Sequence, residues 1–233
     1  MRRSLGEEPM QIFGFPLSPF VRKVLVAAGE KAIEVDNVVF NPRQPPPEFR
    51  AASPFGKIPA LQDGDYRLAD STAIVTYFEA LRPEPALIPA EPRARGKAIW
   101  FEEFADTIAT AAGAKILFNR FVAPRLLGIP GDEEAARKGE QELVPILSYL
   151  EREAPAEGWL AGEWFSVGDI AVASVLTSLG YVGMTPTAAT HPATAAWLAR
   201  VAARPAWQTV TGREKALLAK RLGEAGKTPV DAA

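Results

Sequence analysis

The stretch that decides the fold of this chain is Phe15-Pro16-Leu17-Ser18-Pro19-Phe20-Val21-Arg22-Lys23-Val24. It joins an apolar run, residues 10–15, to an amphipathic run whose apolar residues recur at helical spacing. Ser18 is a favourable N-cap residue, because its hydroxyl accepts a hydrogen bond from an otherwise unpaired backbone N–H. Pro19 suits the first helical position, where its missing N–H costs nothing. The stretch predicts a strand, a loop and a helix, with Ser18 at the positive end of the helix, where an anion can be held.

Composition excludes several classes of function. The 233 residues are 48% hydrophobic and carry a formal net charge of −2, so neither nucleic acid nor an anionic membrane is an expected partner. The absence of cysteine removes disulfides, thiolate metal sites and a cysteine nucleophile. A single histidine, His191, argues against a zinc site and a Ser-His-Asp triad, and no metal is expected. Residues 1–9 lack the apolar segment of a secretory signal, and the most apolar window, residues 170–184, is too short to span a bilayer. We therefore expect a cytoplasmic protein.

The N-terminal part reads as strands mixed with helices. The predicted elements are a strand at 10–15, a helix at 19–32, a strand at 33–40, a short strand ending near 61, a return strand at 66–68 and a helix that starts after Asp70-Ser71. The first three form a βαβ crossover, which implies parallel pairing. Asp63-Gly64 is a hairpin signal, so the next two strands pair antiparallel. The predicted order is βαβ-ββα.

The C-terminal part has helical patterns and no convincing strand. A proline-rich linker, residues 83–92, separates a first domain at 10–82 from a second at 93–222, with tails at 1–9 and 223–233. Helical patterns cover residues 93–121, 132–153, 166–181, 192–203 and 205–222. Pro145 predicts a kink or a boundary in the second of these helices. Ser166 and Asp169 have the spacing of a capping box, a structural role.

A second informative stretch is Ser53-Pro54-Phe55-Gly56-Lys57-Ile58-Pro59-Ala60-Leu61. Pro59 cannot donate to a strand ladder, so it belongs at a strand start or edge, or forms a cis peptide bond that exposes neighbouring backbone groups to a ligand. Together with the Ser18 loop and Asp70-Ser71, this stretch resembles the cytosolic glutathione S-transferases, in particular the serine-type classes, which are phi-like or theta-like, and their bacterial relatives. The resemblance covers about residues 10–222.

The resemblance implies an α/β N-terminal thioredoxin-like domain that binds glutathione, an all-α C-terminal domain and a homodimer. Glutathione is the implied co-substrate, and its thiolate is added to hydrophobic electrophiles. Ser18 matches the serine whose hydroxyl donates to the glutathione sulfur. Ile58 matches the residue whose backbone meets the cysteinyl part, followed by a cis Pro59. Lys57 is placed near the glycine carboxylate, where Arg43 or Gln44 could assist.

Two further sets of residues follow from the resemblance. Asp70 and Ser71 match the positions that hold the γ-glutamyl end, although Asp70 stands where many relatives have the longer glutamate. The electrophile pocket is predicted from Phe15 and Leu17, which flank Ser18, and from Phe104 and Ile108 on the first long helix of the second domain.

The residues alone leave other interpretations open. Ser18 and Asp70-Ser71 are also ordinary helix caps, and Pro59 also suits a plain edge strand. A glutathione-dependent peroxidase, isomerase or dehalogenase would use the same thiolate. A non-catalytic binding protein of the same fold would keep the site without turnover.

Overall fold

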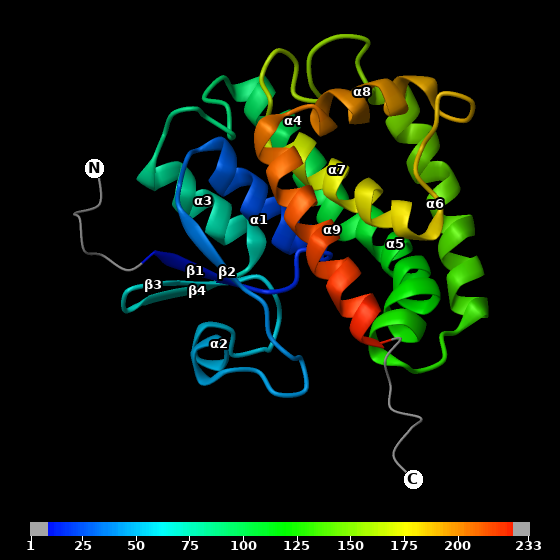
Figure 1. Ribbon diagram of the computed structural model, residues 1–233. Helices are drawn as coiled ribbons and strands as arrows, with labels where there is room; N and C mark the ends of the chain where they lie inside the picture. Colours follow the sequence, from blue (N-terminus) through cyan, green and yellow to red (C-terminus); the bar gives the residue numbers. More distant parts are fainter. Residues whose placement is uncertain (1–8, 226–233) are drawn as a thin grey trace.

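The computed structural model of the protein describes residues 9–225. Its N-terminal domain is a small sheet with helices on both faces, and its C-terminal domain is helical (Figure 1). This is the predicted thioredoxin-like α/β domain followed by an all-α domain. The elements of the first domain are β1 (Met10–Phe13), α1 (Pro19–Glu30), β2 (Val35–Val38), α2 (Pro47–Ala52), β3 (Ala60–Asp63), β4 (Tyr66–Ala69) and α3 (Ser71–Leu81).

The register of the sheet brings the three informative stretches to one edge. The strand order is β2-β1-β3-β4, with β2 parallel to β1 and with β3 antiparallel to both β1 and β4. Phe13 lies opposite Ala60, and Ala60 lies opposite Ala69. The end of β1, the start of β3 and the end of β4 therefore meet. The Ser18 loop, the Ile58-Pro59 segment and Asp70-Ser71 adjoin these three strand ends.

The second domain packs its helices around α7. Its elements are α4 (Pro92–Glu103), the π-helical η1 (Phe104–Ala109), α5 (Thr110–Leu117), the π-helical η2 (Phe118–Leu127), α6 (Glu133–Glu153), α7 (Val167–Leu179), the 3-10 turn η3 (Gly180–Val182), α8 (Pro192–Ala202) and α9 (Pro205–Ala225). Nearly every side chain of α7 is buried, which agrees with its apolar surface on all sides. The capping box is formed, since Asp169 accepts hydrogen bonds from the Ser166 amide at 3.0 Å and the Ser166 hydroxyl at 2.9 Å.

Helix α1 joins the two domains. It packs against α3 on the sheet and against α7 and α9 of the helical domain. Figure 1 shows α1 and α3 on the face of the sheet toward the helical domain, with α2 on the opposite face. The consecutive charged residues Arg22 and Lys23 of α1 are both fully buried, so each must find polar partners in this contact.

Three local predictions differ from the structure. In place of the single α-helix predicted over residues 93–121, the structure has one continuous helical segment that changes from α-helical to π-helical geometry at η1 and again at η2. Pro145 forms no boundary, because α6 runs through it from Glu133 to Glu153. Helix α9 extends to Ala225, past the predicted end at 222. The remainder of the predicted tails, residues 1–8 and 226–233, lies outside the described residues.

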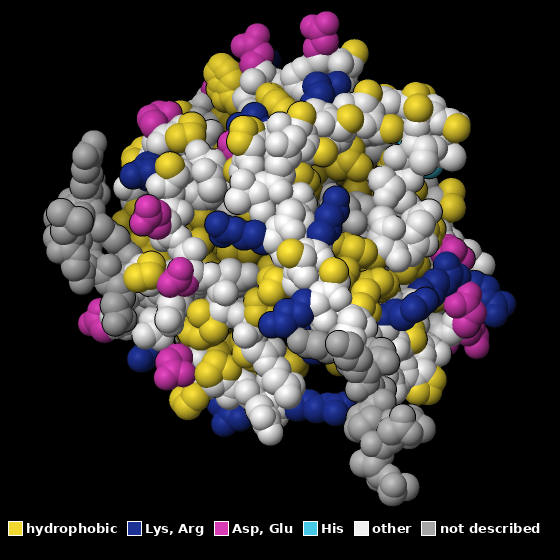
Figure 2. Space-filling view, in the orientation of Figure 1, with side chains coloured by type: hydrophobic (Ala, Val, Ile, Leu, Met, Phe, Trp, Pro, Cys, Tyr) yellow, Lys and Arg dark blue, Asp and Glu magenta, His cyan; other side chains and the backbone are white. Residues whose placement is uncertain are grey.

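The surface shows mixed charge. On the face drawn in Figure 2, acidic side chains lie mostly around the rim and several basic side chains lie across the middle, with apolar side chains between them. Among the helices within residues 9–225, none has the length and apolar character needed to cross a membrane.

Candidate active site

Ser18 has a fixed backbone and a side chain that its own helix does not use. Its amide donates to the Phe15 carbonyl at 3.0 Å, and its carbonyl accepts from the Arg22 amide at 2.9 Å. It holds the N-cap position of α1, as predicted, but its side chain makes no capping hydrogen bond. Ser18 instead lines a cavity of about 220 Å³ between α1, α5, η2 and α7. The hydroxyl therefore stays available at the cavity wall, at the positive end of α1.

Ile58 and Pro59 lie directly beside the Ser18 loop. The Ile58–Pro59 peptide bond is cis, which agrees with one of the two predicted arrangements. Ile58 precedes β3, and within residues 9–225 its amide and carbonyl make no backbone hydrogen bond. At Gly14, whose φ is +144°, a Cβ would lie 3.1 Å from the Ile58 Cβ and 2.6 Å from Val21 Cγ2. Only glycine permits this close approach of β1, α1 and the Ile58 segment.

Asp70 caps α3 with one oxygen of its carboxylate. Its Oδ1 accepts hydrogen bonds from the amides of Thr72 at 2.9 Å and Ala73 at 3.0 Å, which leaves Oδ2 for another partner. The Asp70 φ is +83°, a value that non-glycine residues adopt at a cost, and such strain concentrates at functional sites. The adjacent Ser71 is 2% exposed. The cap interpretation of Asp70 is thus confirmed, and it is compatible with a ligand on the second oxygen.

An acidic cluster beside Asp70 was missed in the sequence. Lys23 Nζ lies 2.5 Å from Glu102 Oε1 and 2.6 Å from Asp106 Oδ2, and Thr72 donates to the same Glu102 oxygen. The pKa of Asp106 is raised to about 6, because burial, together with the neighbouring carboxylates of Glu102 and Asp70, outweighs the lowering effect of Lys23. The available signal was the pair of acids one helical turn apart, at 102 and 106, together with two consecutive basic residues, Arg22 and Lys23, on a mostly apolar helix.

Lys57 and the β2–α2 loop are exposed. The Lys57 carbonyl accepts from the Ser53 hydroxyl at 2.7 Å, which fixes the backbone before Ile58, while the side chain extends into solvent. Arg43 and Gln44 are exposed on the loop between β2 and α2. The structure thus leaves three polar side chains accessible near this end of the domain.

The residues that line the cavity at Ser18 differ from those predicted for the electrophile pocket. Its lining consists of apolar, small and hydroxyl-bearing residues, namely Ser18, Pro19, Phe20, Thr110, Gly113, Ala114, Leu117, Phe118, Val122, Val175, Ser178 and Leu179. Leu17 is buried, and Phe15 is half-buried under the Arg221 guanidinium. Phe104 and Ile108 line a different hollow, of about 560 Å³, between α4–η1 and α6. The structure does not bring Phe104 and Ile108 to the Ser18 cavity.

The orientation of the predicted apolar stripe explains this difference. Its residues do share one face, but that face lines the hollow against α6 and not the Ser18 cavity; they are Trp100, Phe104, Ile108 and Ala111. The face that reaches Ser18 is instead Thr110, Gly113, Ala114 and Leu117, which are themselves spaced at i, i+3, i+4 and i+7.

Comparison with known proteins agrees with this architecture. The family described as "Glutathione S-transferase, N-terminal domain" matches residues 12–86, and "Glutathione S-transferase, C-terminal domain" matches residues 107–205. Glutathione S-transferase F10 of Arabidopsis thaliana is 30% identical over 207 residues, a match that covers 85% of this chain and 94% of that protein. FtsZ-localized protein A of Caulobacter vibrioides is 29% identical over 206 residues, covering 84% and 88%. A solved glutathione S-transferase from Rhodospirillum rubrum F11 has a TM-score of 0.79 at 27% identity, covering 86% and 91%.

The chain therefore belongs to the glutathione S-transferase family, and the resemblance stated from the sequence is confirmed.

Proposed function

We propose that this protein conjugates the glutathione thiolate to small hydrophobic electrophiles, with Ser18 as the residue that stabilises the thiolate. The observation that carries the proposal is Ser18, whose hydroxyl makes no capping bond and which lines an apolar cavity between the two domains. A hydroxyl in that place has one proton to donate to a sulfur, while its oxygen remains an acceptor.

The energies suffice without a metal or a general base. A cysteinyl thiol has a pKa near 8.5, and lowering it by about two units requires roughly 2.7 kcal/mol of preferential thiolate stabilisation. A hydrogen bond to a charged group contributes about 1.5–3 kcal/mol. The N-terminus of α1 adds roughly 0.3–1 kcal/mol, and about 2 kcal/mol where it is partly buried. Ser18 thus acts by favouring the charged sulfur and not by removing its proton.

The edge of the sheet supports the rest of the glutathione molecule in this proposal. Unpaired backbone groups of Ile58 suit the amide groups of the cysteinyl residue, because an extended peptide pairs with such groups as an added strand does. The accessible Lys57 suits the glycine carboxylate. Asp70 Oδ2, Ser71 and the partly exposed Asp106 suit the γ-glutamyl end, whose ammonium would relieve the excess of carboxylates there.

The test is a comparison of Ser18→Ala with Ser18→Thr, which keeps a hydroxyl. Calorimetry should show nearly unchanged glutathione binding for Ser18→Ala, while ultraviolet titration of the bound thiol shows a pKa raised by about one to two units. Ser18→Thr should retain most of the lowered pKa. Conjugation of an aryl halide should fall with the thiolate population. An unchanged thiol pKa in Ser18→Ala would contradict the assignment of Ser18 as the residue that stabilises the thiolate.

The alternatives use the same site and differ in the reaction. The first alternative is a binding protein of the same fold that keeps the glutathione site without turnover. Retention on glutathione resin without conjugation of any of a panel of electrophiles would favour this second function. Turnover of a peroxide, an isomerisable substrate or a haloacid in preference to an aryl halide would favour the other glutathione-dependent reactions.

We further propose that the protein acts as a homodimer. Phe55 projects from the loop before β3 and is 91% exposed, an unusual position for a large aromatic side chain. The hollow lined by Trp100, Phe104, Ile108 and Tyr149 offers an apolar site on the same molecule. A twofold axis would place each Phe55 in the hollow of the other copy. Phe104 and Ile108 then serve association.

Sedimentation of the Phe55→Ala variant tests this arrangement. It should sediment as a monomer at concentrations where the parent protein is a dimer. A matched variant, Ile129→Ala, removes another side chain that is 44% exposed but lies on the loop before α6. That control should remain dimeric. A dimer in both variants would contradict the proposed contact.

A further inference from the structure

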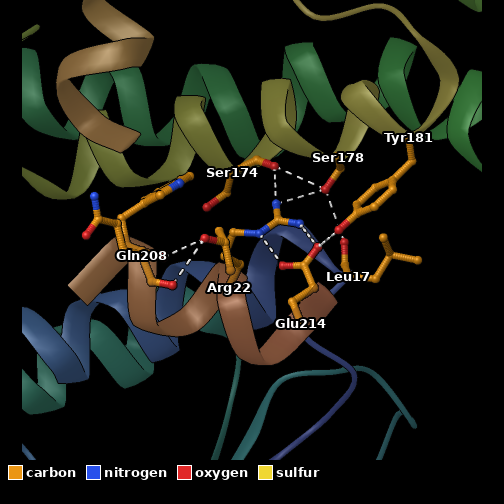
Figure 3. A network of polar contacts seen from close by, with 9 residues as sticks. Leu17, Arg22, Ser174, Ser178, Tyr181, Gln208 and Glu214 are labelled. Carbon is orange, nitrogen blue, oxygen red and sulfur yellow. Dashed lines mark hydrogen bonds and ion pairs between the residues drawn. The ribbon is translucent and has the colours of Figure 1, made fainter. Parts of the chain in front are cut away.

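A buried polar cluster lies directly behind the Ser18 loop, and one of its members, Ser178, also lines the Ser18 cavity. Arg22 of α1 and Glu214 of α9 are fully buried and form a two-point ion pair, with Nε–Oε2 at 2.8 Å and Nη2–Oε1 at 2.6 Å. Figure 3 shows the guanidinium between Glu214 on one side and Ser174 and Ser178 of α7 on the other. Tyr181 donates to Glu214 Oε1 at 2.6 Å, which closes the cluster.

Ser178 is the member of this cluster that touches the Ser18 loop. Its hydroxyl accepts from Arg22 Nη1 at 2.9 Å and lies 3.1 Å from the carbonyl oxygen of Leu17. The Ser174 carbonyl is also 3.1 Å away, but it already receives Arg22 Nη1 at 2.5 Å. A serine has one proton to give. Because the Ser174 carbonyl already accepts from Arg22, we assign that proton to the Leu17 carbonyl, and the bond from Arg22 into the same hydroxyl oxygen polarises it.

The Leu17 carbonyl depends on this contact. Leu17 is 4% exposed, and within residues 9–225 no other donor reaches its carbonyl oxygen. An unpaired carbonyl in such a place is costly. The peptide unit between Leu17 and Ser18 is thus held at both ends, by Ser178 at the carbonyl and by the Phe15 carbonyl at the Ser18 amide. This orients the peptide plane from which the Ser18 side chain departs.

We infer that Ser178 is a positioning residue, which sets the Ser18 hydroxyl for the sulfur by holding the Leu17–Ser18 peptide unit with the support of Arg22 and Glu214. The inference rests on the proposed role of Ser18. A hydroxyl–sulfur contact weakens steeply when its direction changes, so a small rotation of this peptide unit reduces thiolate stabilisation while glutathione binding continues.

The chain offers a matched control one helical turn away. Ser174 is also buried on α7, but its hydroxyl is without a hydrogen-bond partner in the described part of the chain. Ser174→Ala and Ser178→Ala remove the same atom from the same helix, and alanine favours the helix in both. Ser178→Thr restores the hydroxyl. The readouts are the pKa of the bound glutathione thiol, the KM for glutathione, kcat with an aryl halide and the thermal midpoint.

The expected result is specific to Ser178. Ser178→Ala should raise the bound-thiol pKa by about half a unit and lower kcat near neutral pH, with little change in KM. Ser174→Ala should match the parent protein, and Ser178→Thr should restore the parent pKa. A purely structural role would lower the thermal midpoint of Ser178→Ala and leave the thiol pKa unchanged, which overturns the inference. Equal pKa shifts in Ser174→Ala and Ser178→Ala would also overturn it.

The proposed function fails in a different way. If the parent protein does not lower the glutathione thiol pKa, or if Ser18→Ala leaves it unchanged, then Ser18 has no thiolate to stabilise. If both behave as proposed and Ser178→Ala has the parent pKa, only the positioning role is removed.

Discussion

Arg22 and Lys23 are neighbours on α1, and both are fully buried, yet they belong to two clusters of opposite design. The Arg22 cluster is closed: one cation meets one carboxylate, Glu214, with two-point geometry and further bonds to α7. The Lys23 cluster is open: one cation meets Glu102 and Asp106, with Asp70 nearby. Glu102 Oε2 lacks a hydrogen-bond partner among the described residues.

The two clusters suit different roles: the Arg22 cluster suits structural support, and the Lys23 cluster suits the binding of a ligand. A balanced buried pair has nothing left to offer a ligand, and its geometry fixes α1, α7 and α9 together. A cluster with more carboxylates than cations, with Asp106 of η1 partly exposed, has charge left for a bound ammonium. Under the function proposed above, α1 thus contributes to the support behind Ser18 through Arg22 and to an anionic subsite through Lys23.

The largest expected effect on stability comes from a substitution in the Arg22 cluster. Glu214→Ala leaves the Arg22 guanidinium buried without its carboxylate, and removing one partner of a buried pair costs about 3–5 kcal/mol. Urea denaturation should show this loss of unfolding free energy. Glu157→Ala, at an exposed position, should change stability by less than about 0.5 kcal/mol. If the two variants lose equal stability, the Arg22 cluster does not support the fold.

The matching change in the open cluster should affect binding instead. Asp106→Asn leaves Lys23 with Glu102 and reduces repulsion among carboxylates, so stability should change by less than about 1 kcal/mol. The KM for glutathione should rise about tenfold, because an ionic hydrogen bond of roughly 1.4 kcal/mol is lost. Steady-state kinetics with Asp36→Asn on the exposed edge strand as a control would check this. A stability loss as large as that of Glu214→Ala would remove the contrast between the clusters.

The pH dependence of binding sharpens the same contrast. Because burial raises the Asp106 pKa to about 6, this carboxyl is mostly protonated at pH 5 and mostly ionised at pH 7. The ionised form attracts the ammonium, so affinity should rise several-fold as pH increases through about 6. For the unliganded protein the sign is opposite: the raised pKa stabilises the fold at low pH, and this contribution is lost as pH rises through about 6.

Calorimetry with S-methylglutathione, which has no thiol to titrate, isolates the pH effect. Asp106→Asn should bind with a nearly flat profile between pH 5 and pH 7. A parent profile that is already flat would show that Asp106 does not face the ammonium.

The sequence predicts the meeting of the three strand ends better than the lining of the Ser18 cavity, for a physical reason. The edge depends on local signals: a strand before Ser18, an Asp-Gly turn at 63–64 and a proline at 59 together determine which strand ends meet. The cavity depends on which face of the helix turns toward α1, and tertiary packing decides this: the apolar stripe through Phe104 and Ile108 faces α6, while another face of α5 lines the cavity.

Local sequence signals also do not predict the Arg22 cluster that supports the Ser18 loop. Arg22 and Glu214 are 192 residues apart in the chain, and Arg22 and Ser178 are 156 apart. An amphipathic pattern places Arg22 on a helix but contains nothing about which residue of a distant helix will neutralise it. The pairing of buried polar groups is decided by tertiary packing, where each unpaired group carries a cost.

The smallest expected effect on stability comes from removing one hydrogen bond at the margin of the Arg22 cluster. Tyr181→Phe removes one hydrogen bond to Glu214 Oε1, but both bonds from Arg22 remain, and Tyr181 is only half-buried. Unfolding free energy should fall by about 1 kcal/mol. Tyr66→Phe, an exposed tyrosine outside the cluster, should cost less. The bound-thiol pKa should stay at the parent value, because the contacts from Arg22 through Ser178 to Leu17 are intact. A thiol pKa raised as far as in Ser178→Ala would mean that the whole cluster, and not the Ser178 contact alone, sets the Ser18 loop.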